Sequence, residues 1–145
     1  MRASTLIALA SAVCCSAAEP TLPVVLYETT DAQGRHLQYR SDTKTLWDTP
    51  QSGLGPEEQP LSMKDACKIA YDAGMRQFPK AEGLSWLSLK FIRNNFDYSY
   101  GRIVTWFYVI SVAPVFHVGS DYNSGPPIEI VILLSGKVIE PTVVK

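Results

Sequence analysis

The sequence contains few residues of the kinds that metal-dependent chemistry requires. Its two histidines, His36 and His117, lie far apart in the chain. A metal site needs several ligands at set spacings, and two isolated histidines in different segments offer no such spacing. Surface histidines are the simpler interpretation. We therefore predict no metal site and no cofactor.

Nucleophilic and acid–base chemistry also lack a recognisable pattern. Cys67 would need a nearby histidine and an electropositive setting to act as a nucleophile. It falls among the small residues of a predicted helix, where a buried apolar side chain is the simpler interpretation. There is no G-x-S-x-G elbow, P-loop or dinucleotide glycine motif. The acidic pair Glu57-Glu58 lies in a Pro/Gly-rich stretch, which gives no low-dielectric wall for acid–base work. We predict no catalytic residue.

The aromatic residues are the main candidates for ligand or partner binding. Three alternate just before a long apolar stretch, two lie within that stretch and one follows in the next loop; they are Phe96, Tyr98, Tyr100, Trp106, Tyr108 and Tyr122. Exposed aromatic side chains mark binding surfaces. Residues 117–127, rich in Gly, Ser, Asn and Pro, could form a lip over the same face. The alternative is ordinary cross-strand packing of Tyr98 and Tyr100 at a hairpin end.

The stretch that must position these residues is Ile103 to Val112, in which β-branched and aromatic residues dominate. Both sets of alternate positions are apolar, with Trp106 and Tyr108 in one set and Phe107 in the other. A strand of this kind is covered on both faces. It is closed by Pro114 after about ten residues, whereas a bilayer span needs about 20. We predict that it is the central strand of a sheet.

Residues Ser62 to Phe78 are predicted to form a helix. Ser62 is a good N-cap, and Asp65 three residues later makes a short capping box. Pro79 ends the helix. Small and apolar residues recur at spacings of three and four, namely Met63, Ala66, Cys67, Ala70, Ala73 and Gly74. Such a narrow stripe of small side chains lets a helix lie close on a sheet.

Ahead of this helix, residues 24–29 and 35–40 are predicted to form a β-hairpin. Its turn begins with Asp31 and ends with Gly34, as a type I turn closing on a residue with positive φ requires. Residues 43–61 contain three prolines and two glycines and are predicted to be a surface linker. Leu46 and Trp47 are its only large apolar residues, and we expect both to hold it to the body.

The remaining strands are predicted at Leu84–Phe91, Ile128–Leu134 and Lys137–Glu140, with a loop at 94–102 and a stop at Pro141. The predicted fold class is α+β, with one helix packed on an antiparallel sheet of three to four strands and preceded by the N-terminal hairpin. One helix covers one face of that sheet. The other face must be covered by the hairpin, by Trp47, by a second subunit or by a ligand.

The N-terminus has the pattern of a secretory signal peptide. Arg2 is followed by a short apolar run and by small residues, with a cut expected after Ala17 or Ala18. A lipid anchor at Cys14 or Cys15 is the alternative. The predicted division is a signal peptide at 1–18, the hairpin and linker at 19–60 and an α+β domain at 61–145.

Removal of residues 1–18 removes Arg2, so 12 of the 13 basic residues remain. All 14 acidic residues remain, and the net charge is −2. This charge does not favour nucleic acid as a partner. A single cysteine, Cys67, then remains and cannot form an internal disulfide, so packing must stabilise the exported fold. The predicted location is periplasmic or secreted.

From Leu61 to Pro141, the chain resembles PepSY-like domains, small exported α+β modules that are broadly cystatin-like in layout. The features that carry the resemblance are the helix alanines Ala66, Ala70 and Ala73, the segment Trp106-Phe107-Tyr108-Val109 and the final Gly136-Lys137-Val138. The inhibitory Gln-x-Val-x-Gly loop of cystatins is absent. The resemblance implies an exported binding or inhibitory module and supplies no site.

The leading functional hypothesis is an exported, non-enzymatic module that binds a protein, a peptide or an envelope component through the aromatic sheet face. One alternative is a structural homodimer of the cell envelope, with the sheet face buried between subunits. The other is a hydrolase with an unrecognised site, assembled from scattered residues such as Tyr108, His117 and Asp121. No transmembrane helix is expected.

Overall fold

The computed structural model describes residues 21–50, 59–99 and 101–144. Of these residues, 57% lie in strands and 18% in helices. Within the described ranges the chain forms two sheets, of three and five strands, and two helices. The predicted fold class, one helix on a single sheet of three to four strands, is therefore wrong. The predicted signal peptide and residues 51–58 of the predicted linker lie outside the described residues.

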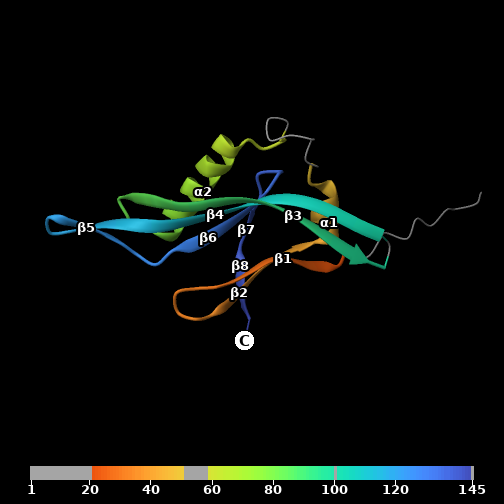
Figure 1. Cartoon of the computed structure of the whole chain (residues 1–145), viewed down its shortest axis with the longest axis horizontal. Coiled ribbons are helices and arrows are strands. Elements are labelled where there is room, and N and C mark those ends of the chain that lie inside the picture. Colours follow the sequence, from red (N-terminus) through yellow and green to blue (C-terminus); the bar gives the residue numbers. More distant parts are fainter. Residues whose placement is uncertain (1–20, 51–58, 100, 145) are drawn as a thin grey trace, which may run out of the picture.

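The elements form three layers. Their bounds are β1 (Pro23–Thr30), β2 (His36–Asp42), α1 (Thr43–Asp48), α2 (Met63–Gln77), β3 (Gly83–Tyr98), β4 (Gly101–Val118), β5 (Asp121–Ser124), β6 (Ile128–Leu133), β7 (Val138–Ile139) and β8 (Pro141–Val144). The three-stranded sheet has the order β1-β2-β8, and the five-stranded sheet has the order β3-β4-β6-β7 with β5 paired to the far part of β4. Figure 1 shows α2 above the large sheet and the small sheet below it.

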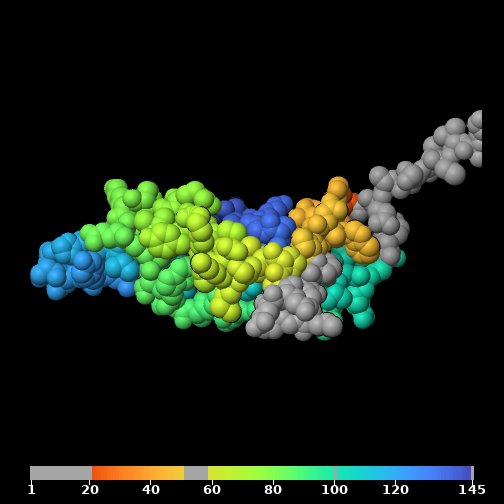
Figure 2. All heavy atoms as spheres, turned by 90° about the horizontal axis from the view of Figure 1, so that it is seen from above, coloured from red at the N-terminus to blue at the C-terminus, as the bar shows by residue number. Residues whose placement is uncertain are grey.

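The face of β4 that points to α2 is closed by small side chains. Alternate β4 and β6 residues pack against the helix in one cluster, which includes Tyr108, Ile110, Val112, Ile130 and Ile132 with Ala66, Ala70 and Ala73. The predicted helix is confirmed, and the hydroxyl of its N-cap Ser62 accepts a hydrogen bond from the Asp65 N–H at 3.1 Å. Seen from above, α2 lies along the large sheet and the β5 end of the molecule projects beyond it (Figure 2).

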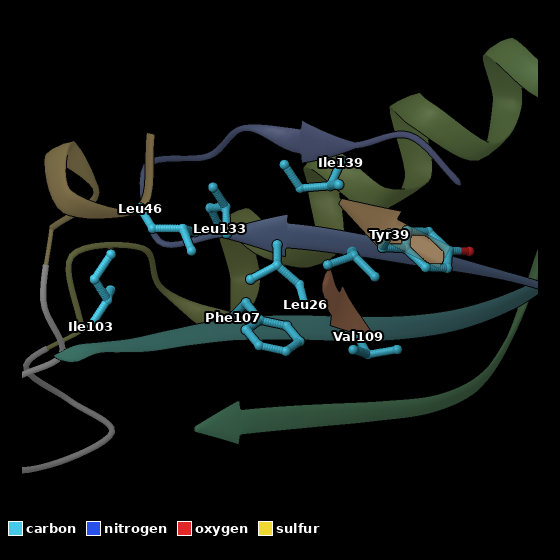
Figure 3. Packing of buried hydrophobic residues seen from close by; sticks show 9 residues of the cluster. Leu26, Tyr39, Leu46, Ile103, Phe107, Val109, Leu133 and Ile139 are labelled. Carbon is cyan, nitrogen blue, oxygen red and sulfur yellow. The ribbon is translucent and has the colours of Figure 1, made fainter. Parts of the chain in front are cut away.

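The opposite face of β4 is covered by the small sheet, which resolves the question that the sequence left open. Phe107 and Val109 of β4 are buried in a second cluster with Leu26 of β1 and Tyr39 of β2 (Figure 3). The prediction that both parities of this strand are covered is thus confirmed. Asn94 of β3 adds a polar link, because its side-chain N–H donates to the Leu26 carbonyl at 2.9 Å.

The N-terminal hairpin is confirmed, and it does not join the large sheet. β1 and β2 pair antiparallel, and Gly34 closes their turn with a φ of 76°. Leu37 is half-buried and Tyr39 is buried, while His36 and Arg40 are exposed, which agrees with the predicted alternation. The third strand of this sheet is β8, which pairs with β2. Pro141, predicted to stop the last strand, instead begins β8.

The segment predicted to be a linker begins with a helix. Asp42 caps α1 by accepting hydrogen bonds from the Thr45 N–H at 2.7 Å and the Thr45 hydroxyl at 2.9 Å. Leu46 is 0% exposed, whereas Trp47 is 64% exposed, so of these two residues Leu46 packs into the body and Trp47 does not. In Figure 3, Leu46 lies near Ile103 at one end of the inner cluster, and Tyr39 lies at the other end.

β3 and β4 are longer than the sequence predicted. They pair from Gly83↔Val115 to Tyr98↔Gly101, so most of the predicted 94–102 loop is strand. β4 also continues through Pro114, whose carbonyl accepts from the Gly125 N–H at 2.7 Å. A proline is tolerated there because the ladder with β6 extends only to Val112 and the ladder with β5 begins at Val115, so Pro114 lies between the two. The register of β3 shifts between Trp86 and Ser88, which leaves the intervening Leu87 54% exposed rather than in the core.

Candidate functional site

The predicted aromatic residues do not form one surface. Phe96 and Tyr98 lie on β3 and pack against the inner cluster under the large sheet. Trp106 and Tyr108 lie on the opposite face of β4, against the α2 cluster. Tyr122 of β5 is 69% exposed at the far end of β4. Tyr100 lies outside the described residues. The aromatic binding face stays a prediction, and its described members are divided between two faces and two ends of the sheet.

The aromatic residues on the α2 side have partners within the fold. The rings of Phe91 and Trp106 stack with centroids 4.8 Å apart and planes 21° apart. The Arg93 guanidinium lies 5.9 Å from the centroid of the Trp106 ring, a cation–π distance. The Tyr108 hydroxyl donates to the Leu61 carbonyl at 3.0 Å. These contacts are those of a packed sheet face that anchors the segment before α2.

The residues suggested for a hydrolase are not brought together. His117 and Asp121 lie at the β4–β5 hairpin, where the His117 ring contacts Tyr122 at a centroid distance of 5.0 Å. Tyr108 lies nine residues earlier on β4, about 30 Å away along an extended strand. Among residues 21–50, 59–99 and 101–144, no group of three or more His, Cys, Asp or Glu side chains could hold a metal ion.

A substantial hollow of the described surface lies between the two sheets. It is a cleft of about 610 Å³, lined by the hairpin, by the start of β6, by β8 and by the C-terminal end of α2. Its lining residues include Asp31, Arg35, Leu37, Tyr39, Ser111, Pro126, Pro127, Ile128, Glu129, Pro141 and Val143. In Figure 1 the turn between β1 and β2 lies below the start of β6, and α1 lies at the other end of the small sheet. α1 therefore closes one end of the space between the sheets, and the cleft opens at the other.

In the hairpin turn at the mouth of the cleft, the charges of Asp31 and Arg35 are paired with each other. The Asp31 carboxylate accepts from the Arg35 N–H at 2.8 Å, from the Arg35 Nε at 2.7 Å and from the Gln33 N–H at 3.0 Å. Desolvation opposes the charge of Asp31, but these hydrogen bonds outweigh it and hold the pKa of the carboxyl below its usual range. The positive charge of Arg35 is thus paired with Asp31 and does not neutralise other groups of the cleft.

Glu129 is the charged residue at the floor of the cleft. Its Cα partner is Ser111, so its side chain points between the sheets with Val131 and Leu133. Its Oε1 accepts from the Tyr27 hydroxyl at 3.1 Å, and its backbone carbonyl accepts from the Tyr39 hydroxyl at 2.6 Å. Its Oε2 is buried, and no donor among the described residues reaches it. A carboxylate can accept about four hydrogen bonds, so much of this capacity is unused.

The two tyrosines keep their protons beside this carboxylate. Burial and then the negative charge of Glu129 raise the pKa of Tyr27 above its ordinary value. The same two causes, in the same order, raise the pKa of Tyr39. Both hydroxyls therefore remain donors at neutral pH and fix the position of Glu129 between the sheets.

The cleft also has an apolar wall, and one end of it is not covered by any described residue. The register places Val143 opposite Leu37 and Pro141 opposite Tyr39, so the four side chains share the face that points to the large sheet. Tyr39 is 1% exposed in the core, yet Val143 on the same face is 48% exposed. The exposure of Val143 arises because the two sheets diverge at the cleft.

Glu129 stands out in the sequence as the one polar exception in its strand, but sequence reasoning assigned it no role. It is the only charged residue in an otherwise apolar strand, and its position alternates with residues that face the core. A carboxylate in such a strand must find donors or a ligand. The tyrosines that flank it come from a distant hairpin, and their position beside β6 follows from the docking of the small sheet.

Comparison of the chain with protein-family models, with curated proteins and with solved structures finds no match. The resemblance to PepSY-like domains therefore stays a prediction. Neither helix in the described part of the chain is long and apolar enough to cross a membrane.

Proposed function

We propose that this chain is an exported, non-enzymatic binding module and that its ligand occupies the cleft between the two sheets. The leader pattern of residues 1–18 supports export to the periplasm or beyond. The resemblance to PepSY-like domains implies a function of the same class. The location of the site rests on the geometry of the cleft rather than on the aromatic residues.

The observation that carries this proposal is the pairing of an underused carboxylate with an uncovered apolar wall. One donor among the described residues reaches the Glu129 side chain, and Val143 on the inner face of β8 is 48% exposed. Ligand sites combine an apolar lining with a few placed polar groups in this way. Because Arg35 is paired with Asp31, the complementary ligand has a cationic hydrogen-bond donor attached to an apolar group.

Benzamidinium is a suitable probe, because it has a planar cationic fork on an apolar ring. We expect it to bind to the mature protein, and we expect neutral benzamide, which has the same shape, to bind about tenfold more weakly or not at all. The Glu129→Gln variant keeps an oxygen for the Tyr27 hydroxyl and loses the charge, so it should bind benzamidinium about tenfold more weakly. Isothermal titration calorimetry measures all three affinities.

The matched control is Glu28→Gln, which removes the same charge from the opposite face of the hairpin. Glu28 accepts a hydrogen bond from the Gln38 side chain and is about half exposed. This variant should bind benzamidinium as the wild-type protein does. Equal loss in both variants would show a general effect of net charge, and absence of any binding to the wild-type protein would reject the cleft as a cation site.

A homodimer is the second candidate, and the edge of the large sheet favours it. β3 is 16 residues long, and its outer side has no strand partner among the described residues. Long unpaired edges are templates for pairing with another chain. However, the register shift at Leu87 and the charges of Lys90 and Arg93 are features that oppose edge pairing. Sedimentation showing a strict monomer at high protein concentration would exclude the homodimer.

A further inference from the structure

We propose that the ligand is an extended peptide segment of another protein, which adds as an antiparallel strand to the free edge of β8 and places a lysine or arginine over Glu129. This inference rests on the proposed function, because it assigns a ligand class to the same cleft. Three features support it: the hydrogen-bonding direction of β8, the direction of its side chains and the charge of the cleft.

The hydrogen bonds of the hairpin turn fix which groups of β8 are free. The Asp31 N–H donates to the Arg35 carbonyl at 3.0 Å, so this pair is a hydrogen-bonded one. Hydrogen-bonded and non-hydrogen-bonded pairs alternate in an antiparallel ladder. The backbone groups of Leu37 and Tyr39 therefore point to β1, and those of His36 and Gln38 point to β8.

The same alternation then applies to the next strand. Thr142 and Val144 are the partners of Gln38 and His36, so their backbone groups bond to β2. The Val143 N–H and carbonyl point the other way, to the edge of the three-stranded sheet that has no strand partner among the described residues. Pro141 points to that edge as well, where the missing N–H costs no ladder bond. β8 thus offers one complete donor–acceptor pair at Val143.

Side chains on an added strand would be directed into the cleft. In an antiparallel ladder, the residue opposite Val143 projects to the same face as Val143. That face points to the large sheet, from which the Glu129 side chain projects back. The aliphatic part of a long basic side chain would cover Val143 and Leu37, and its charged end would approach Glu129.

The charge of the cleft selects a basic residue. Arg35 forms its ion pair with Asp31 at 2.7 Å, and no lysine or arginine in the described residues is paired with Glu129. A strand that presents a glutamate at this position would meet like charge, and a strand that presents an apolar residue would leave the carboxylate without a further donor.

The test uses an acetylated and amidated heptapeptide of alternating threonine and valine with lysine at its centre. We expect binding to the mature protein by calorimetry, about tenfold weaker binding when norleucine replaces the lysine, and no binding when glutamate replaces it. N-methylation of the lysine backbone removes the N–H that would donate to the Val143 carbonyl, so it should weaken binding at least about tenfold. N-methylation of the next residue, whose N–H points away from β8, should change affinity by less than about twofold.

Equal effects of the two N-methylations would overturn strand addition, whatever the affinity of the peptide. In the protein, Val143→Pro removes the outward N–H and leaves the bonds of Thr142 and Val144 to β2, so peptide affinity should fall further than in Val143→Ala, which shortens the same side chain but keeps that N–H. If Val143→Pro does not fold, the comparison of N-methylated peptides still decides. Binding of benzamidinium without binding of the peptide would reject this inference and leave the proposed function intact, whereas binding of neither probe would reject both.

Discussion

At the scale of single residues, Glu129 and Tyr39 determine how the small sheet meets the large one. The Tyr39 hydroxyl donates to the Glu129 backbone carbonyl at 2.6 Å, across the interface between β2 and β6. The ring of Tyr39 is buried in the inner cluster and lies 5.9 Å from the ring of Tyr27. One side chain therefore supplies both apolar contact and the hydrogen bond at the closed side of the cleft.

Removal of this hydroxyl should destabilise the fold. In Tyr39→Phe the Glu129 carbonyl loses its donor, and a buried acceptor left unpaired costs about 1–3 kcal/mol of the free energy of unfolding. Tyr71→Phe is the matched control, because Tyr71 lies on α2 and is 38% exposed. It should change stability by less than about 0.5 kcal/mol. Urea denaturation at pH 7 measures both, and an unchanged midpoint for Tyr39→Phe would contradict this account.

The stabilities of the wild-type protein and Tyr39→Phe should converge at alkaline pH. Burial and the Glu129 charge raise the pKa of Tyr39 in the folded state. A raised pKa stabilises the fold fully below the pKa of the unfolded chain, about 10 for tyrosine, and this contribution is lost as the pH rises further. Wild-type stability should therefore fall above about pH 10, and Tyr39→Phe should fall less steeply, so the difference between the two narrows. A constant difference from pH 7 to 11 would argue against a buried, protonated Tyr39.

At the scale of elements, α1 closes the end of the inner cluster that lies opposite the cleft. Leu46→Ala should cost about 2–5 kcal/mol, because it leaves a cavity in a site that is 0% exposed. Trp47→Ala removes a larger side chain from the next position, but Trp47 is 64% exposed, so the cost should stay below about 1 kcal/mol. Thermal or urea unfolding compares the two. A larger loss of unfolding free energy in Trp47→Ala than in Leu46→Ala would mean that α1 packs through the face that carries Trp47.

The strongest elements could be predicted from the sequence because their signals are local. The cap Ser62, the alanine spacing of α2 and the Asp31–Gly34 turn each follow from contacts within a few residues. α1 was missed because Pro50 and the glycines that follow it dominate the composition of that segment, while the cap Asp42 precedes it. The length of β3 was missed because Asn94 and Asn95 favour loops locally, and cross-strand pairing with β4 overrides that preference.

The cleft could not be predicted, because it depends on a contact between distant parts of the chain. β8 pairs with β2 across about a hundred residues of sequence, and a tetrad such as Pro141 to Val144 carries little strand signal of its own. The apolar character of both faces of β4 did predict that a second layer was needed. The pattern of β4 did not indicate that the small sheet would diverge from β6 at Glu129.

At the scale of the whole molecule, a large sheet is covered by a helix on one face and by a small sheet on the other. The space between the sheets is closed at Leu46 and open at Val143 and Glu129. Trp106 and Tyr108 of β4 lie on the helix-covered face, whereas Phe107 lies in the inner cluster, so the cleft and the surface around Trp106 are alternative sites for the proposed binding. We propose the space between the sheets as the binding site, and the surface around Trp106 is the alternative.

The most direct test of the cleft is a map of amide chemical shifts in the mature, isotope-labelled protein during titration with benzamidinium. We expect the largest shifts at Leu37, Glu129 and Val143, and we expect them to disappear in Glu129→Gln. Shifts centred on Phe91 and Trp106, or shifts in the cleft that persist in Glu129→Gln, would contradict it.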